Sequence, residues 1–205
     1  MTTKRITWTD ANGTVRVTTP APEAMSALTG SGGKLHPDHI EKQSAAYAAA
    51  GMSSESALKL ATAYANGGLD DAEALDLIWQ RTLADQKKKG NNPTNVVNIE
   101  ADSLPYFGSF GRGAWKQDGA NAPTFDMSKA RTIKTGQIRP ERNKRLADLD
   151  VSYIRADEAG DTATKEKIAV QKQKLRDLPA TIQSDLNALD TPDKLENFQP
   201  TWPEA

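Results

Sequence analysis

Apolar and polar residues alternate at the start of the chain, over residues 4–9 and again over residues 15–18. Period-two alternation is typical of half-buried strands, and the Asn12-Gly13 pair between the two runs favours a type I′ turn. We therefore expect a β-hairpin over residues 4–18. A lone hairpin is only marginally stable in water, so it must pack on another part of the chain.

Between residues 37 and 89 the apolar spacing becomes helical, and glycines divide the segment into three runs. Ser53 or Ser54 can cap the second run and Asp70 or Asp71 the third, because these side chains accept hydrogen bonds from the free N–H groups of a first helical turn. The sequence therefore predicts three short helices.

The segments beside these helices have a different composition. Pro20 and Pro22 end the hairpin, and Gly30-Ser31-Gly32-Gly33 is interpreted as a flexible connector. After a second linker at Asn91-Asn92-Pro93, Val96–Ile99 is a short apolar strand candidate that can pair with the hairpin. Such pairing would complete a three-stranded sheet.

The last third of the chain carries the clearest periodicity. One series has the spacing 3, 4, 3, 4 and consists of Leu146, Leu149, Tyr153, Ala156 and Gly160. A second has the spacing 4, 3, 4, 3 and consists of Thr164, Ile168, Gln171, Leu175 and Leu178. Two such seams joined by a Gly-Asp turn predict an antiparallel helical hairpin. Gly136 and Pro140 are expected to weaken or kink its first helix, and Pro179 to end its second.

These patterns predict a mainly α fold with a small β element. We expect five segments in chain order, which are a β-hairpin and linker (1–34), a helical subdomain (35–90), a strand and aromatic loop (91–125), a helical hairpin domain (126–189) and a Pro-rich acidic tail (190–205).

Composition restricts the classes of function. The 205 residues include no cysteine, which excludes disulfides, thiolate zinc sites and cysteine nucleophiles. No apolar run approaches the roughly 20 residues that span a bilayer, so we expect a soluble, unexported protein without a membrane partner. A net charge of -1 argues against a nucleic-acid binder, which usually has a strong basic excess.

Two glycine-rich segments fall short of nucleotide-binding motifs. Gly30–Lys34 faintly resembles a phosphate-binding loop, but Leu28 replaces its first glycine and Leu35 its Ser or Thr. Gly108–Gly113 does not read G-x-G-x-x-G, and Asn121-Ala122-Pro123 soon contradicts the helix that should follow. A linker and a structural turn region are the better interpretations.

Metal-binding and catalytic signals are weak as well. His36 and His39 are the only histidines, whereas a stable zinc site usually needs three or four protein ligands. The nucleophile elbow G-x-S-x-G is missing, and the scattered carboxylates are explained as caps or solvated faces. We expect that the protein is not an enzyme and that it has no catalytic residues, no metal-binding residues and no cofactor.

Contact with other proteins is the remaining class. The loop over residues 101–125 is rich in aromatic residues and needs a partner surface, either the sheet or another protein. Residues 129–150 hold seven basic and three acidic side chains, a net charge of +4, without the aromatic platform that single-stranded nucleic acid requires. The candidate partner-binding residues are Tyr106, Phe107, Phe110, Trp115, Arg139, Arg142, Arg145 and Trp202.

Six short motifs over residues 96–189 carry a resemblance to a known family. They are Ala114–Gly119, Asp126–Arg131, Ile138–Asn143, Leu146–Val151, Ala159–Thr162 and Lys174–Pro179. In this order they resemble small proteins of tailed bacteriophages, of the tail assembly chaperone type, often encoded near tail and tail-fibre genes. The loop Tyr106–Gly113 departs from that pattern, and residues 35–90 are an addition to it.

The resemblance implies a tail-associated structural or adaptor protein that docks on tail or tail-fibre subunits. The alternative that it implies is an assembly chaperone for the tail or tail fibre that is not retained in the virion. Either protein would occur in the host cytoplasm during assembly, and the structural component would end in the virion tail. Homo-oligomers are compatible with both, and the family has no catalytic residues to carry over.

Overall fold

The computed structural model describes residues 4–203, and the fold is mainly α with a small β part, as the sequence predicts. The chain forms two compact units. Unit 1 contains the residues up to Pro105 together with Lys116–Thr124, and unit 2 contains Tyr106–Trp115 and the residues from Phe125 onward. The chain therefore enters unit 2, returns to unit 1 and enters unit 2 again.

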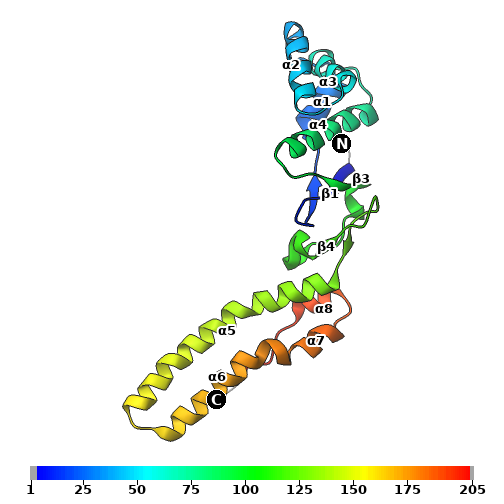
Figure 1. Cartoon of the computed structure of the whole chain (residues 1–205). Helices are drawn as coiled ribbons and strands as arrows, with labels where there is room; N and C mark the ends of the chain where they lie inside the picture. Colours follow the sequence, from blue (N-terminus) through cyan, green and yellow to red (C-terminus); the bar gives the residue numbers. More distant parts are fainter. Residues whose placement is uncertain (1–3, 204–205) are drawn as a thin grey trace. The chain divides into compact units, whose positions relative to one another are not determined.

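Unit 1 combines a small sheet with four α-helices among its described residues (Figure 1). Its elements are β1 Lys4–Thr9, β2 Val15–Thr18, α1 Pro22–Thr29, η1 Pro37–His39, α2 Ile40–Ala49, α3 Ser54–Asn66, α4 Asp71–Lys88, β3 Thr94–Glu100 and η2 Ala101–Ser103, where η marks a 3₁₀ helix.

The strand order of this sheet is β2-β1-β3, and both pairings are antiparallel. Thr7 lies opposite Val17 on one side and Val97 on the other. The expected pairing of Val96–Ile99 with the hairpin is thus confirmed. Ile6 and Trp8 of β1 are buried in the same cluster as Leu28 and Trp79, so the helices supply the packing that a lone hairpin lacks.

The expected type I′ turn at Asn12-Gly13 is wrong. Gly13 has a φ of 75°, but Asn12 does not have the positive φ that type I′ also requires at the first central residue. Instead the Asp10 carbonyl accepts a hydrogen bond from Gly13 N–H at 3.0 Å, and the Asp10 carboxylate accepts from the N–H groups of Asn12 and Thr14. The acidic side chain therefore organises a longer loop.

Helices α3 and α4 begin where the capping signals place them. Ser53 caps α3 by accepting from Ser56 N–H, and Asp70 caps α4 by accepting from Glu73 N–H. The three helices expected over residues 37–89 are confirmed as α2, α3 and α4. Helix α1 was not expected: Pro22 occupies its first turn, where a fixed φ and a missing N–H cost nothing.

The segment Gly30–Gly33 is held in place and does not act as a loose connector. Gly33 N–H donates to the Ala65 carbonyl at 2.9 Å, and Gly68 N–H donates to the Gly30 carbonyl at 3.1 Å. A Cβ added to Gly67 would lie 1.9 Å from the Gly30 carbonyl oxygen. The two glycine segments therefore touch backbone to backbone, which only residues without side chains permit.

Unit 2 is a long helical hairpin with two short helices and a 3₁₀ segment at one end (Figure 1). Its elements are η3 Gly108–Ala114, α5 Met127–Glu158, α6 Thr162–Thr181, α7 Gln183–Ala188 and α8 Pro192–Asn197. The short strands β4 Trp115–Lys116 and β5 Thr124–Phe125 pair with each other.

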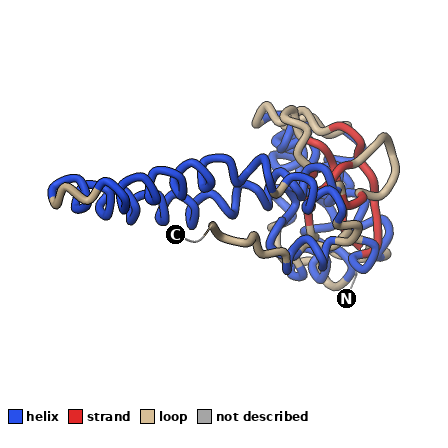
Figure 2. Tube along the Cα trace, turned by 90° about the horizontal axis from the view of Figure 1, so that it is seen from below, coloured by secondary structure: helices blue, strands red, loops and turns tan. Residues whose placement is uncertain are grey.

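The antiparallel hairpin of α5 and α6 is confirmed, and Figure 2 shows the two helices side by side along their length. Gly160 has a φ of 68°, and Asp161 caps α6 by accepting from Thr164 N–H, so the Gly-Asp turn forms as expected. Ala156 and Leu175 of the two seams are buried.

The expected end of the second helix at Pro179 is wrong. Helix α5 runs without interruption through Gly136 and Pro140, and α6 continues past Pro179 to Thr181. Proline at position 140 leaves the Gly136 carbonyl without an intrahelical donor. Both residues are exposed, so water can reach that carbonyl.

The last described residues pack into unit 2. Thr191 caps α8 and Pro192 occupies its first turn. Leu186 and Leu195 are both fully buried in a cluster with Phe110, Ile138 and Leu178, and Phe198 and Trp202 pack against that cluster. Part of the expected acidic tail is therefore a structural element of the hydrophobic core.

Candidate docking surface

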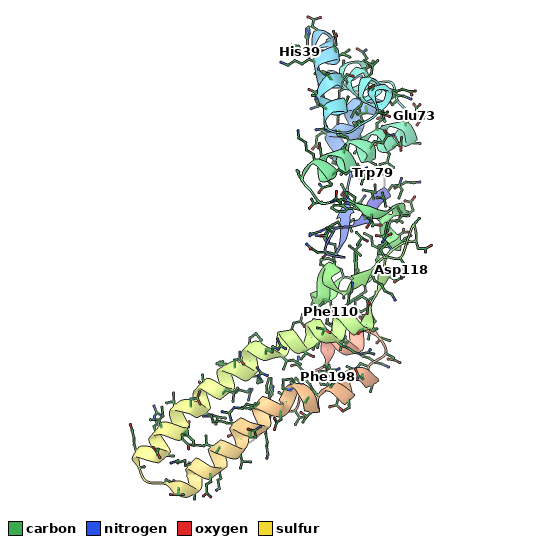
Figure 3. The ribbon with its side chains drawn as sticks, in the orientation of Figure 1. His39, Glu73, Trp79, Phe110, Asp118 and Phe198 are labelled. Carbon is green, nitrogen blue, oxygen red and sulfur yellow. The ribbon has the colours of Figure 1, made fainter. Side chains whose placement is uncertain are left out.

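The aromatic loop of unit 2 is built around Phe110. This side chain is 4% exposed, and its ring meets the Phe125 ring edge to face at 5.8 Å. Gly111, the next residue, has a φ of 58° and kinks the chain inside η3. Figure 3 labels Phe110 and Phe198, which lie beside the N-terminal part of α5.

Trp115 is the second buried aromatic residue of the loop. Its indole N–H donates to the Tyr106 carbonyl at 2.8 Å, and its ring meets the Phe107 ring edge to face at 6.1 Å. Phe110 and Trp115 were both expected to contact a partner. Burial leaves them almost no surface for that role, and they support the neighbouring residues instead.

Tyr106 and Phe107, which we name the aromatic pair, are 40% and 55% exposed. The Tyr106 hydroxyl donates to the Glu196 carboxylate, and Ser109 N–H donates to its second oxygen at 2.8 Å. The Glu196 carbonyl in turn accepts from Lys134 Nζ at 2.7 Å. Tyr106 is thus exposed but held by Glu196 of α8 and by Trp115, and Phe107 packs on the Trp115 ring.

The contact between Tyr106 and Glu196 shifts the pKa of both groups. The hydrogen bond to Glu196 raises the pKa of Tyr106 to about 12, because losing the phenol proton would place two negative oxygens together. The same bond, with help from Ser109, lowers the pKa of Glu196 below its usual range. The contact is therefore fully present between the ordinary pKa values of glutamate and tyrosine.

This coupling predicts a late-titrating tyrosine. The phenolate absorbance of Tyr106→Phe, subtracted from that of the unchanged chain, should show one group that titrates near pH 12 and not near the ordinary value of about 10. The contribution of this contact to stability should be lost as the pH rises through that value. It should also be lost when acid protonates Glu196. A difference curve centred on pH 10 would contradict the contact.

Three members of the basic segment on α5 serve the interior of unit 2. Lys129 Nζ donates to the Trp115 carbonyl at 2.9 Å, and Lys134 is buried against Glu196. Burial lowers the pKa of Lys134. Arg131 donates to the carbonyls of Leu186, Asn187 and Leu189, so it satisfies the C-terminal end of α7.

The other basic candidates differ in their surroundings. Arg145 lies over the Trp202 ring at 4.5 Å and pairs with Glu141 at 2.8 Å, so the structure joins two residues that were nominated separately. Arg142 contacts the side chain of its neighbour Asn143 at 3.0 Å. Arg139 is exposed. Of these three candidates, Arg139 and Arg142 form no ion pair with another residue of the range 4–203.

Unit 1 offers a cleft but no metal centre within residues 4–203. The cleft has a volume of about 520 Å³, and the Arg81 guanidinium lies over the Tyr47 ring at 5.1 Å on its wall. The imidazoles of His36 and His39 are 5.9 Å apart, and His36 caps η1. No group of three metal-ligating side chains gathers among these residues.

Glu196 is the residue of this surface that sequence reasoning missed. Its segment was interpreted as tail because of its acidic, proline-rich composition. A signal was present, because Thr191 followed by Pro192 is a cap and a first-turn proline.

Among the helices of residues 4–203, none combines the length and the apolar composition that a membrane span requires.

No protein-family model, curated protein or solved structure matches the chain.

Proposed function

We propose that the chain is a non-enzymatic structural or adaptor component of a bacteriophage tail, which docks on tail or tail-fibre subunits through the aromatic pair. The bacteriophage assignment rests on the six motifs that resemble tail assembly proteins. The docking assignment rests on one observation, that Tyr106 and Phe107 are exposed while Glu196 and Trp115 hold the Tyr106 hydroxyl and carbonyl and Trp115 contacts the Phe107 ring.

Exposed aromatic residues on a rigid support suit protein recognition. Burying a large ring on a partner gives favourable free energy, and aromatic side chains dominate the energetic centres of interfaces. Ordering a loop on binding usually opposes association. Glu196 and Trp115 already hold this loop, so most of that entropic cost falls on folding and not on binding.

Mass spectrometry of purified virions tests the assignment. A structural component should give peptides in a fixed ratio to known tail subunits. Peptides found in infected lysate and missing from virions would reject retention in the particle, and would support the alternative of an assembly chaperone. The alternative uses the same surface, because a chaperone must also hold a tail or fibre subunit.

The role of the aromatic pair has its own test. Phe107→Ala should weaken binding to the tail or fibre subunit about tenfold or more, the loss of at least 1.4 kcal/mol that is typical of an interface centre. Leu58→Ala is the matched control, because Leu58 is 51% exposed against 55% for Phe107 but lies on α3. Equal binding by both variants, measured by calorimetry, would place the contact elsewhere.

A further inference from the structure

A second periodic stripe runs along α5 on the side away from α6. Its members have the spacing 4, 3, 4, 3, 4, are all exposed, and are Pro140, Lys144, Ala147, Val151, Ile154 and Glu158. At 100° per residue they lie opposite the seam of Leu149, Tyr153 and Ala156. Val151 and Ile154, at its centre, are 49% and 56% exposed. We name these six residues the outer stripe.

Charged residues flank the outer stripe in two different ways. On one flank, Asp150 pairs with Lys172 of α6, and Asp157 pairs with Lys165 of α6. The charges of these two carboxylates are therefore already paired with lysines across the α5–α6 hairpin.

On the other flank, Asp148 and Arg155 are exposed, and neither forms an ion pair with any residue of the described range 4–203. They lie seven residues apart, about 10 Å along the helix, which is too far for them to pair with each other. Both charges remain available to a second chain.

We propose that the outer stripe docks on the outer stripe of a second copy of this chain, with the two α5 helices antiparallel about a two-fold axis between Val151 and Ile154. In that register Val151 meets the partner's Ile154, and the same contact occurs again by symmetry. Arg155 then faces the partner's Asp148, and Asp148 faces the partner's Arg155. Each chain contributes one unpaired acidic and one unpaired basic side chain, so the dimer gains two intermolecular ion pairs.

The charges of the stripe itself select this orientation. A parallel pairing would place Lys144 against the partner's Lys144, and Glu158 against the partner's Glu158. The antiparallel register places Glu158 beside the partner's Ala147 and separates the lysines. It brings Asp150 near the partner's Asp157, and the α6 lysines bound to these carboxylates offset that repulsion.

The apolar centre of the stripe is small, so the dimer is a weak one. Interfaces below about 1,200 Å² are typical of transient contacts. Sedimentation equilibrium of the full chain should show a concentration-dependent monomer and dimer. A chain that stays monomeric up to about 1 mM, where only about 4 kcal/mol of association free energy would be needed, overturns the proposal.

Matched substitutions locate the contact. Ile154→Lys should raise the dissociation constant at least tenfold, because it places a charge at the two-fold axis. Val170→Lys is the control, since Val170 is also 56% exposed but lies on the outer side of α6. Both positions are on the surface, so both variants should fold. An equal effect of the two substitutions overturns the assignment to α5.

A charge exchange tests the pairing of Arg155 with the partner's Asp148. Arg155→Asp and Asp148→Arg should each raise the dissociation constant several-fold, and the double variant should restore it, since the cycle isolates the interaction between the two positions. Additive losses in the double variant overturn the register.

Cross-linking tests the orientation, because the chain has no cysteine of its own. A mixture of Ala147→Cys and Glu158→Cys chains should form the mixed disulfide. Oxidation of Glu158→Cys alone should leave monomers, and a disulfide dimer there would indicate the parallel arrangement and overturn the proposal. The dimer is independent of the proposed tail function, because neither its apolar contact nor its charge pairs use Tyr106 or Phe107.

Discussion

Replacing Leu195 by alanine is expected to lower the free energy of unfolding of unit 2 by about 2–5 kcal/mol, the range for fully buried leucines. Leu195 is 0% exposed, and it lies on α8 in a cluster with Phe110 and Leu186. The substitution leaves a cavity among side chains that come from four separate segments. The same cavity should loosen α8 and hence the hold of Glu196 on Tyr106.

Hydrogen exchange measured peptide by peptide is the appropriate readout, because it follows each unit separately. Protection should fall in α5, α7 and α8 and stay unchanged in unit 1. Val170→Ala is the control on an exposed face, where a change within about 0.5 kcal/mol is expected. A similarly small loss for Leu195→Ala would mean that α8 is not part of the core.

Replacing Gly67 by alanine is expected to destabilise unit 1 by about 2–6 kcal/mol. The backbone of Gly67, with φ 71° and ψ −149°, lies in a region that is essentially restricted to glycine and costs other residues about 1–3 kcal/mol. The new Cβ would also lie 1.9 Å from the Gly30 carbonyl oxygen, and overpacking of this kind costs about another 1–3 kcal/mol.

The neighbouring glycine separates these two causes. Gly68 also has a positive φ, of 85°, but a Cβ there would meet no atom within 4 Å. Gly68→Ala should therefore show only the backbone cost of about 1–2 kcal/mol. Thermal unfolding of unit 1 distinguishes the two variants. If both lost the same stability, the close approach of the glycine segments would not contribute to the fold.

Local patterns were sufficient to predict those parts of the fold whose causes lie within a few residues. The caps Ser53 and Asp70 act on N–H groups three residues ahead. The seams of α5 and α6 can be recognised from residue spacing alone. The short apolar run around Val97 is typical of a strand, and Val97 pairs with Thr7. Each of these signals can be recognised without knowing what the element packs against.

The remaining features depend on residues that are distant in the chain. Gly30–Gly33 has the composition of a linker, and only the backbone of Ala65 shows that it is packed. Helix α1 has eight residues and no side-chain cap, so its pattern is too short to recognise. Pro140 is tolerated because it and Gly136 lie on the exposed side of α5. The sequence alone does not show which side of this helix is exposed.

The candidate docking surface, too, could be predicted from the sequence only in part. Sequence composition selected four of the five aromatic residues of the loop over residues 101–125, but it could not separate the exposed Tyr106 and Phe107 from the buried Phe110 and Trp115. That difference depends on the kink at Gly111 and on the packing of α8 in the same cluster as Phe110. Glu196 is 90 residues beyond Tyr106, so no local pattern connects them.

The position of Glu196 also determines when the aromatic pair takes its shape during synthesis. A ribosome releases Tyr106 long before Glu196, so a nascent chain carries this loop without the carboxylate that holds it. Until α8 emerges and folds onto α5, the Tyr106 hydroxyl and the Ser109 N–H lack the Glu196 carboxylate and remain bonded to water. If the aromatic pair docks as proposed above, docking through the ordered loop is therefore expected only after α8 has been synthesised and has folded onto α5.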